Sequence, residues 1–234
     1  MTAAGDASEP EVVELGDGQR IGIRPIRSDD KDLIARVFDR MSPETRYRRF
    51  FAPLQRLSEQ DLRYLTEVDH DDHEALVAFE PEDGELVGVA RYVRSEEPTE
   101  AEVAVVVIDP WQGRGVATAM LDRLVERARE TGIDHFVALV LSENQDAIEL
   151  FRHVAPGGST TRRSASGHVE MLIELPEPGG LPDSRLAGVL RTVAAGAIAV
   201  NPWRFFREAI RRRPTEEMQL PEVTPRGGGA GNGE

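Results

Sequence analysis

The sequence contains no cysteine among its 234 residues. Disulfide bonds, cysteine nucleophiles and zinc–thiolate sites are therefore excluded. Lysine is almost missing too, because Lys31 is the only lysine among 28 basic residues, and 42 acidic residues give a formal net charge of -14. This acidic balance argues against nucleic acid as a partner, since binding nucleic acid needs a basic face that displaces counterions.

Long apolar runs are also missing. The longest weakly polar stretch, LAGVLRTVAAGAIAV (residues 186–200), contains an arginine and is too short to span a bilayer. The N-terminal stretch MTAAGDASEPEV is acidic and lacks the basic and then apolar pattern of a secretory signal. We therefore expect a soluble cytoplasmic protein.

Apolar periodicity and composition divide the chain into one α/β domain with appendages. Residues 1–10 are predicted to be a disordered lead, and residues 11–176 a layered α/β (α+β) domain. The composition shifts to proline and glycine at the end of that domain, and residues 177–213 are predicted to be a helical extension. Residues 214–234 are expected to be disordered, because TPRGGGAGNGE cannot bury enough apolar surface to fold.

Within the domain, the pattern predicts the element order β-β-α-α-β-β-β-α-β-α-β. The first two strands form a hairpin that turns at residues 16–18, and Ser58 is expected to cap a helix. The near-continuous apolar run AEVAVVVID (residues 101–109) predicts a strand buried on both faces. A helix is expected over residues 113–131, and GGSTTRRSAS (residues 157–166) is interpreted as a mobile loop.

A glycine-rich turn, DPWQGRGVATAM (residues 109–120), follows the buried strand and opens that helix. A helix N-terminus offers unpaired N–H groups and the positive end of a dipole, which suit a phosphate. The nucleotide motif GxxxxGK[ST] is absent because no lysine lies near the turn, and GxGxxG is absent because Thr118 replaces its third glycine. The pattern that remains is Q/R-x-x-G-x-G/A, over residues 112–117.

This turn resembles the acyl-CoA loop of the GNAT superfamily of N-acetyltransferases. Residues 11–175 are most similar to the acetyltransferase domain of bacterial Pat-type protein-lysine acetyltransferases, through IGIRPIRSDD, MSPETRYRRFF, VDHDDHEALVAF and AEVAVVVIDPWQGRGVA. The resemblance implies a GNAT-type mixed central sheet flanked by helices. It also implies direct transfer of acetyl from acetyl-CoA to a primary amine in a ternary complex, with a protein lysine as the expected acceptor. A small-molecule amine acceptor and a non-catalytic acyl-CoA sensor remain as alternatives.

The resemblance also implies a set of cofactor contacts. The backbone of Val106, Val107 and Ile108 is expected to pair with the pantetheine arm, and Asn144 resembles a cofactor-contacting position whose alternative role is an ordinary helix N-cap. Glycine permits close approach of the backbone to a phosphate, and an arginine in the turn adds charge. The residues expected to hold the pyrophosphate are Gln112, Gly113, Arg114, Gly115, Val116, Ala117 and Thr118.

Glu102 is the expected general base, because it precedes Gln112 by the ten residues typical of the resembled family. A carboxylate can take the proton of a lysine ammonium, whose pKa is about 10.4, and burial would raise the pKa of the carboxyl and make it a better base. Glu100 lies on the same face and is the second candidate. Phe151 stands where many family members have a tyrosine that protonates the departing thiolate, which leaves water as the proton donor.

The stretch VDHDDHEA is rich in metal-binding residue types, at residues 69–73. Consecutive residues cannot all point at one ion, however, and no H-E-x-x-H helix accompanies them. We therefore predict a polar loop that leads into a strand, with no metal site.

The resemblance places two segments near the acceptor. His70 and Asp72 of this polar loop are expected at the mouth of the acceptor site. Arg46, Tyr47 and Arg49 lie on a helix that flanks the acceptor groove in the resembled family, and a salt-bridged surface is the alternative for the two arginines.

A basic amphipathic helix is predicted over residues 202–214, PWRFFREAIRRRP. We favour docking of this helix on its own domain or on a second copy of the chain, as in a homodimer. Contact with an anionic membrane is the weaker alternative.

Overall fold

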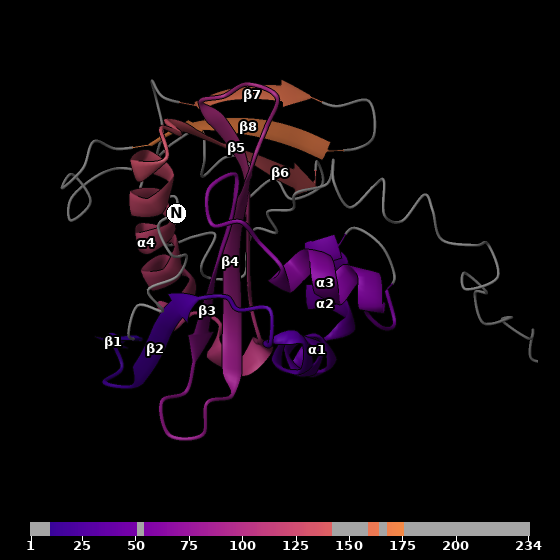
Figure 1. Ribbon diagram of the computed structural model, residues 1–234, viewed down its shortest axis with the longest axis vertical. Coiled ribbons are helices and arrows are strands. Elements are labelled where there is room, and N and C mark those ends of the chain that lie inside the picture. The colour runs from indigo at the N-terminus through magenta and orange to yellow at the C-terminus, as the bar shows by residue number, and fades with distance from the viewer. Residues whose placement is uncertain (1–9, 51–53, 142–158, 164–167, 176–234) are drawn as a thin grey trace, which may run out of the picture. The chain divides into compact units, whose positions relative to one another are not determined.

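A computed structural model describes residues 10–50, 54–141, 159–163 and 168–175 (Figure 1). The predictions of a lead before residue 10, of the helical extension over residues 177–213 and of the tail over residues 214–234 lie outside the described residues. So do the predicted roles of Asn144 and Phe151.

Along the described chain, a hairpin is followed by three helices, three strands, a long helix and three further strands. The strands are β1 (Glu11–Glu14), β2 (Arg20–Pro25), β3 (His73–Phe79), β4 (Leu86–Arg94), β5 (Glu100–Val107), β6 (His135–Leu141), β7 (Ser159–Arg163) and β8 (His168–Glu174). The helices are α1 (Lys31–Arg40), α2 (Pro43–Phe50), α3 (Glu59–Thr66), the 3₁₀ turn η1 (Asp109–Trp111) and α4 (Val116–Glu130). Among these, no helix is long and apolar enough to cross a membrane.

The strands form one mixed sheet of eight strands in the order β1-β2-β3-β4-β5-β6-β8-β7. Neighbouring strands are antiparallel except β5 and β6, which run parallel. This parallel ladder is short, because only Glu100–Glu102 pair with His135–Val137. Figure 1 shows β6, β8 and β7 crossing the upper end of β4 and β5.

Helices cover both faces of the sheet. The long helix α4 packs on β3, β4 and β5 from one side, whereas α1, α2 and α3 lie on the other side (Figure 1). Alternation along β4 makes this division explicit: Tyr92 donates its hydroxyl proton toward the loop before β3 and lies beside Thr131 at the end of α4, whereas Arg91 donates to the Leu65 carbonyl of α3. The strand β5 is buried on both faces, as predicted from its continuous apolar character.

Most predicted elements are confirmed. β1 and β2 form the expected hairpin, in which Gly18 takes a left-handed φ of 81°. Ser58 caps α3 with a full capping box, in which its hydroxyl accepts from the Asp61 N–H while the Asp61 carboxylate accepts from the Ser58 N–H. The helix expected over residues 113–131 begins three residues later, at Val116, because the two glycines before it remain in the turn.

The prediction of a loop over residues 157–166 is wrong in part. Ser159–Arg163 form the edge strand β7, which pairs with β8 from Ser159↔Ile173 to Arg163↔Val169. This polar segment has no apolar alternation to announce a strand. Its strand state comes from the backbone edge that β8 offers, so tertiary context decides where local sequence pattern does not.

Candidate active site

The end of the ladder between β5 and β6 marks the site. Glu102 is the last residue of β5 that pairs with β6, and within the described residues Val103–Val107 have no ladder partner on that side. The predicted pantetheine-binding residues Val106 and Val107 belong to this stretch, and Ile108 follows it with its N–H bonded to Val87 on the β4 side. This part of the β5 backbone can therefore pair with an extended ligand, and the contact to the pantetheine arm stays a prediction.

Glu102 itself is nearly buried, with 6% of its surface exposed. Its cross-strand partner on β4 is Val93, so its side chain shares the face of the sheet that carries Arg91 and the helices α1–α3. Glu100 is more exposed, at the beginning of the strand, and its backbone closes the turn to Glu97 and Ser95. Of the two predicted base candidates, Glu102 therefore lies where the ladder opens.

A cluster of polar side chains lies on the helix-covered face and is linked to Glu102 through Tyr64, and we call it the base cluster. It consists of Glu102 of β5, Tyr64 of α3, Arg49 of α2, Arg91 of β4 and His73 of β3. The Tyr64 hydroxyl lies in the electrostatic field of both guanidinium groups and of the Glu102 carboxylate. Its ring lies 5.2 Å from the His73 ring, and Arg91 Nη1 donates to His73 Nε2 at 3.1 Å. Arg49 and Arg91 are 5% and 1% exposed.

Burial sets the charges in the base cluster. It lowers the pKa of His73 to about 3, and the neighbouring Arg91 guanidinium adds to this effect. Burial also lowers the pKa of Arg49 to about 9 and that of Arg91 to about 10, while it raises the pKa of Tyr64. At neutral pH, both arginines are therefore charged, His73 is a neutral acceptor and Tyr64 keeps its proton.

The cofactor turn, residues 109–118, begins where the unpaired end of β5 stops. Gly113 and Gly115 have left-handed φ values of 73° and 95°, and a Cβ added to either would meet no atom within 4 Å. The backbone there is therefore open to close approach by a ligand. The first backbone bond of α4 runs from the Ala119 N–H to the Gly115 carbonyl. Consequently, the N–H groups of residues 116–118 have no partner inside the helix and face the turn.

The hydroxyl of Thr118 adds a second sign of a ligand site. Its oxygen is buried and has no hydrogen-bond partner in the part of the chain that the structure describes. A buried hydroxyl without a partner is costly, and a phosphate oxygen at this helix N-terminus would satisfy it. Open glycines, unpaired N–H groups and this hydroxyl together fit the pyrophosphate of acetyl-CoA.

Two side chains of the turn form hydrogen bonds with other parts of the protein instead of facing an open site. Gln112 donates its amide hydrogens to the Val107 carbonyl at 3.0 Å and toward the Thr45 hydroxyl at 3.4 Å. Asp109 accepts from the Ser42 N–H and from the Thr45 hydroxyl, both at 3.0 Å. These bonds lower the pKa of Asp109, although burial opposes them. They fasten the beginning of α2, whose far end carries Arg49, to the cofactor turn.

Arg114, which was predicted to add charge for the pyrophosphate, has a carboxylate partner. Its Nε donates to Asp17 Oδ2 at 2.7 Å, and its guanidinium lies 4.6 Å from the centre of the Trp111 ring. Asp17 belongs to the turn of the β1–β2 hairpin. The positive charge of Arg114 is thus matched inside the protein.

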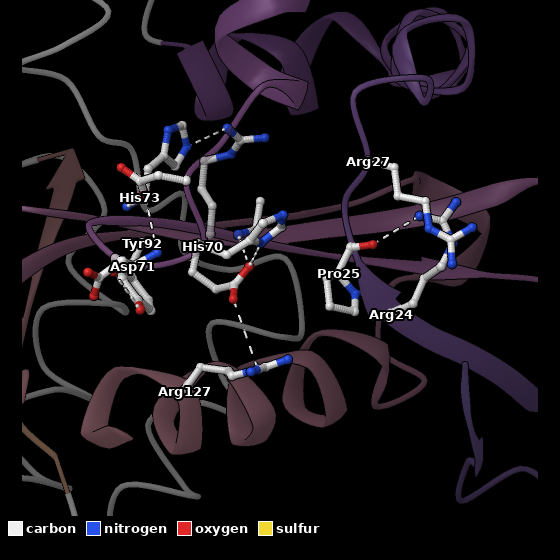
Figure 2. A network of polar contacts seen from close by, with 12 residues as sticks. Arg24, Pro25, Arg27, His70, Asp71, His73, Tyr92 and Arg127 are labelled. Atoms are coloured by element: carbon white, nitrogen blue, oxygen red, sulfur yellow. Dashed lines mark hydrogen bonds and ion pairs between the residues drawn. The ribbon is translucent and has the colours of Figure 1, made fainter. Parts of the chain in front are cut away.

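The polar loop before β3 has mainly structural contacts. His70 adopts a left-handed φ of 62° and bonds through Nδ1 to Glu74 Oε1 at 2.8 Å, while Arg127 of α4 lies 4.0 Å from the other oxygen of this buried carboxylate (Figure 2). Asp72 accepts from Arg94 Nε at 2.5 Å. Both residues that were expected near the acceptor mouth are therefore paired with side chains of the neighbouring strands. Among the described residues, no group of His, Asp and Glu is arranged to hold a metal ion.

The side chains predicted on α2 near the acceptor have different surroundings in the structure. Arg46 donates from Nε to the Phe38 carbonyl at 3.0 Å and from Nη2 to the Asp39 carbonyl at 3.0 Å, so it caps the end of α1. Tyr47 is exposed at 46% of its surface. Arg49 is buried in the base cluster, which the surface alternative did not foresee.

Comparison with known proteins identifies the class. The model of the acetyltransferase (GNAT) family matches residues 35–154. An acetyltransferase of Pseudomonas aeruginosa is 33% identical over 136 residues, which cover 57% of this chain and 73% of that protein. Acetyltransferase Pat of Mycolicibacterium smegmatis is 35% identical over 136 residues, but this match covers 58% of this chain and only 40% of Pat.

Solved structures agree. The GNAT domain of PAT from S. lividans superposes with a TM-score of 0.63 at 36% identity, over 74% of this chain and all (100%) of that domain. The chain therefore belongs to the GNAT family of acetyltransferases and is an N-acetyltransferase that uses acetyl-CoA. The predicted family and the predicted mixed sheet with flanking helices are both confirmed.

Proposed function

We propose that this acetyltransferase modifies lysine side chains of proteins, with Glu102 as the general base. The observation that carries the catalytic part is the position of Glu102 at the last pair of the β5–β6 ladder. Beyond it, the unpaired β5 backbone leads directly to the cofactor turn. A carboxylate at this point lies at the inner end of a path along which an acyl-CoA would extend.

The chain's own groups fit acetyl-CoA in two places. The N–H groups of residues 113–118 and the buried Thr118 hydroxyl would hold the pyrophosphate. The β5 edge at Val106–Ile108 would hold the pantetheine arm through backbone groups other than the Val107 carbonyl and the Ile108 N–H, which bond to Gln112 and Val87, because this edge lacks a strand partner on the β6 side in the described residues. When bound, acetyl-CoA supplies an activated acetyl group as a thioester.

Glu102 would supply the proton acceptor. A lysine ammonium has a pKa of about 10.4, and only its free-base form is a nucleophile. The carboxylate can accept this proton directly or through one water molecule. The guanidinium groups of Arg49 and Arg91, which share the Tyr64 hydroxyl as a neighbour with Glu102, place positive charge in the same cluster. This positive charge favours loss of the proton from a lysine ammonium that binds beside it, because it repels the charged form of the amine.

Two further chemical tasks fall to the backbone and to solvent. Backbone N–H groups on the open edge of β5 can stabilise negative charge that develops on the carbonyl oxygen. The CoA thiol is acidic enough for its thiolate to leave unprotonated and then take a proton from water, so a dedicated acid is not required for the reaction.

The protein-lysine acceptor rests on similarity to the Pat proteins. Within the stretch MSPETRYRRFF, Pro43–Phe50 form α2, which supplies Arg49 to the base cluster. Because the match covers only 40% of Pat from M. smegmatis, the activity of that whole protein is not assumed for this chain. The acceptor class has to be measured.

The test uses acetyl-labelled CoA, the purified protein and a bacterial lysate in which deacetylases are inhibited. Label is counted separately in proteins and in small molecules, with Glu102→Gln assayed in parallel. We expect label in protein lysines and its loss in the variant, while the affinity for CoA stays unchanged. The variant changes one oxygen to an amide and keeps the size of the side chain, so packing is preserved.

Other outcomes would overturn the proposal. Label in small molecules alone would make the protein a small-molecule amine acetyltransferase. No label in either fraction, combined with tight binding of acetyl-CoA and no effect of Glu102→Gln, would favour a non-catalytic acyl-CoA sensor.

A further inference from the structure

The β1–β2 hairpin touches the element that carries the cofactor turn at two places. At its tip, Asp17 accepts a hydrogen bond from Arg114 of the turn at 2.7 Å. At its base, Glu11 accepts hydrogen bonds from both Nε and Nη2 of Arg123 on α4, with Nε at 2.7 Å. The hairpin is therefore docked on α4 near its start and again farther along, through arginine–carboxylate pairs.

The tip contact reaches the part of the turn that is flanked by two glycines. Arg114 stands between Gly113 and Gly115, which both adopt left-handed φ values. Glycine loses more conformational freedom on folding than any other residue, so a turn with two such positions has little stiffness of its own. Arg114 is the side chain between them, and whatever holds its guanidinium also holds the backbone on both sides.

The guanidinium is held from two directions. One face lies 4.6 Å from the centre of the Trp111 ring, and Trp111 is itself 7% exposed. The Nε edge donates to Asp17 Oδ2. Trp111 thus packs against one face of the guanidinium, and the Asp17 carboxylate fixes the direction in which the guanidinium points across the ring.

Asp17 is a firm anchor because the hairpin turn orders it. Its Oδ1 accepts from the Gln19 N–H at 3.0 Å, while Leu15 and Gln19 pair through a backbone bond of 2.7 Å. The bond from Gln19, together with the contact to Arg114, lowers the pKa of Asp17. The carboxylate therefore bridges a hydrogen-bonded hairpin turn and the glycine-containing cofactor turn.

We propose that Asp17 is a positioning residue of the cofactor site, which acts through Arg114 to hold the cofactor turn in its phosphate-binding conformation. The β1–β2 hairpin is then part of the cofactor site, although it supplies no direct ligand. Arg114 serves as a brace and the phosphate falls to backbone N–H groups. The proposal concerns the binding of CoA alone and does not depend on the acceptor.

The direction of the change in CoA affinity distinguishes the positioning role of Asp17 from a purely electrostatic effect of its charge. Replacing Asp17 by asparagine removes a negative charge near the place where phosphates bind, so Coulomb forces alone predict tighter binding of CoA. Loss of the brace predicts weaker binding, because the turn must then be ordered during binding.

The experiment measures the dissociation constants of CoA and of dephospho-CoA, which lacks the 3′-phosphate, by isothermal titration calorimetry. We expect Asp17→Asn to weaken binding of both ligands by the same factor, about two- to five-fold, as suits an exposed ion pair. Asp17→Glu keeps the charge and should restore most of the affinity. Arg114→Gln should weaken binding to a similar degree, and the double variant should be no worse than either single variant.

Glu11→Gln is the matched control. It removes the other arginine–carboxylate pair between the same hairpin and the same helix, away from the turn, and should leave both dissociation constants unchanged. Thermal unfolding of each variant shows whether folding is intact.

Three results would overturn the proposal. Tighter binding by Asp17→Asn would show that the carboxylate competes with phosphate for Arg114. A loss of CoA affinity in Arg114→Gln that is absent with dephospho-CoA would make Arg114 a ligand of the 3′-phosphate. An equal effect of Glu11→Gln would mean that hairpin docking in general, and not Asp17, matters.

Discussion

The cofactor turn and the base cluster lie at opposite ends of the same strand, β5, and are built in different ways. The turn is one continuous segment, residues 109–118, whose ligand groups are mostly backbone N–H groups. The base cluster takes one side chain from each of five separate elements, and it works through charges and hydroxyls that burial has brought together. The turn keeps its geometry through local φ values and one contact to the β1–β2 hairpin, whereas the cluster keeps its geometry through packing of the whole domain.

This difference predicts opposite responses to substitution. Changes in the base cluster should cost folding stability because its charges are buried and bonded. Changes in the cofactor turn should cost ligand affinity with little loss of stability, because the turn is at the surface and its glycines face open space.

The largest effect on stability is expected from Arg91→Leu. It leaves the Leu65 carbonyl and His73 Nε2 without their donor inside the protein, so the free energy of unfolding should fall by about 2–3 kcal/mol. Urea unfolding measures this change. Arg36→Leu is the control, since its ion pair with Glu85 is half-exposed and should contribute less than about 0.5 kcal/mol. Equal effects of the two variants would show that the base cluster is not a buried network.

A pH-dependent loss of stability is expected from His73. The pKa of His73 in the folded protein, about 3, lies below its ordinary value of 6.5. Between these two pH values, the unfolded chain therefore binds a proton at His73 that the folded protein does not bind. Stability from this group is therefore complete above pH 6.5 and is lost as the pH falls toward 3, at up to about 1.4 kcal/mol per pH unit. Urea unfolding at pH 6.5 and 5 should show about 1.6 kcal/mol less change in His73→Gln than in the wild type. The same slope in both proteins would contradict the assignment.

A smaller effect, confined to the ligand, is expected from Gly115→Ala. A left-handed conformation costs a residue with a Cβ about 1–2 kcal/mol, and the turn can relieve this strain by leaving its binding geometry. The affinity for CoA should therefore fall about ten-fold, as measured by calorimetry. Gly84→Ala introduces the same kind of strain, at a φ of 73° in the β3–β4 turn, and should not change this affinity. A loss of CoA affinity in Gly84→Ala would contradict the interpretation that strain within the cofactor turn causes the effect of Gly115→Ala.

The sequence predicted the fold where local pattern decides it. The Gly16–Gly18 hairpin, the Ser58 cap and the doubly buried strand β5 all follow from residue type and spacing. The strand β7 was missed because its polar residues carry no alternation, and pairing with β8 alone makes them a strand. Its position could not be found without the tertiary structure.

The same holds for the site. Glu102 and the glycines of the turn could be predicted as site residues because they share one continuous motif. Tyr64, His73 and Arg91 were missed because they are far from that motif and from each other in sequence. The weak signal that could have marked Arg91 is its place within the apolar run LVGVARYV, where a charge on a buried strand requires partners. The pairing of Arg114 with Asp17, nearly a hundred residues away, had no signal of this kind.

The most direct test of the central claim compares catalysis and cofactor binding in Glu102→Gln. If Glu102 is the base and the cofactor turn is a separate part of the site, kcat/KM for the acetyl acceptor should fall by about 10²–10⁴-fold, as is typical for loss of a general base. The dissociation constant of CoA should remain within about two-fold of the wild-type value. Retained acetyl transfer would show that another group, with Glu100 as the first candidate, accepts the proton. An equal loss of CoA binding would show that the two ends of β5 do not act separately.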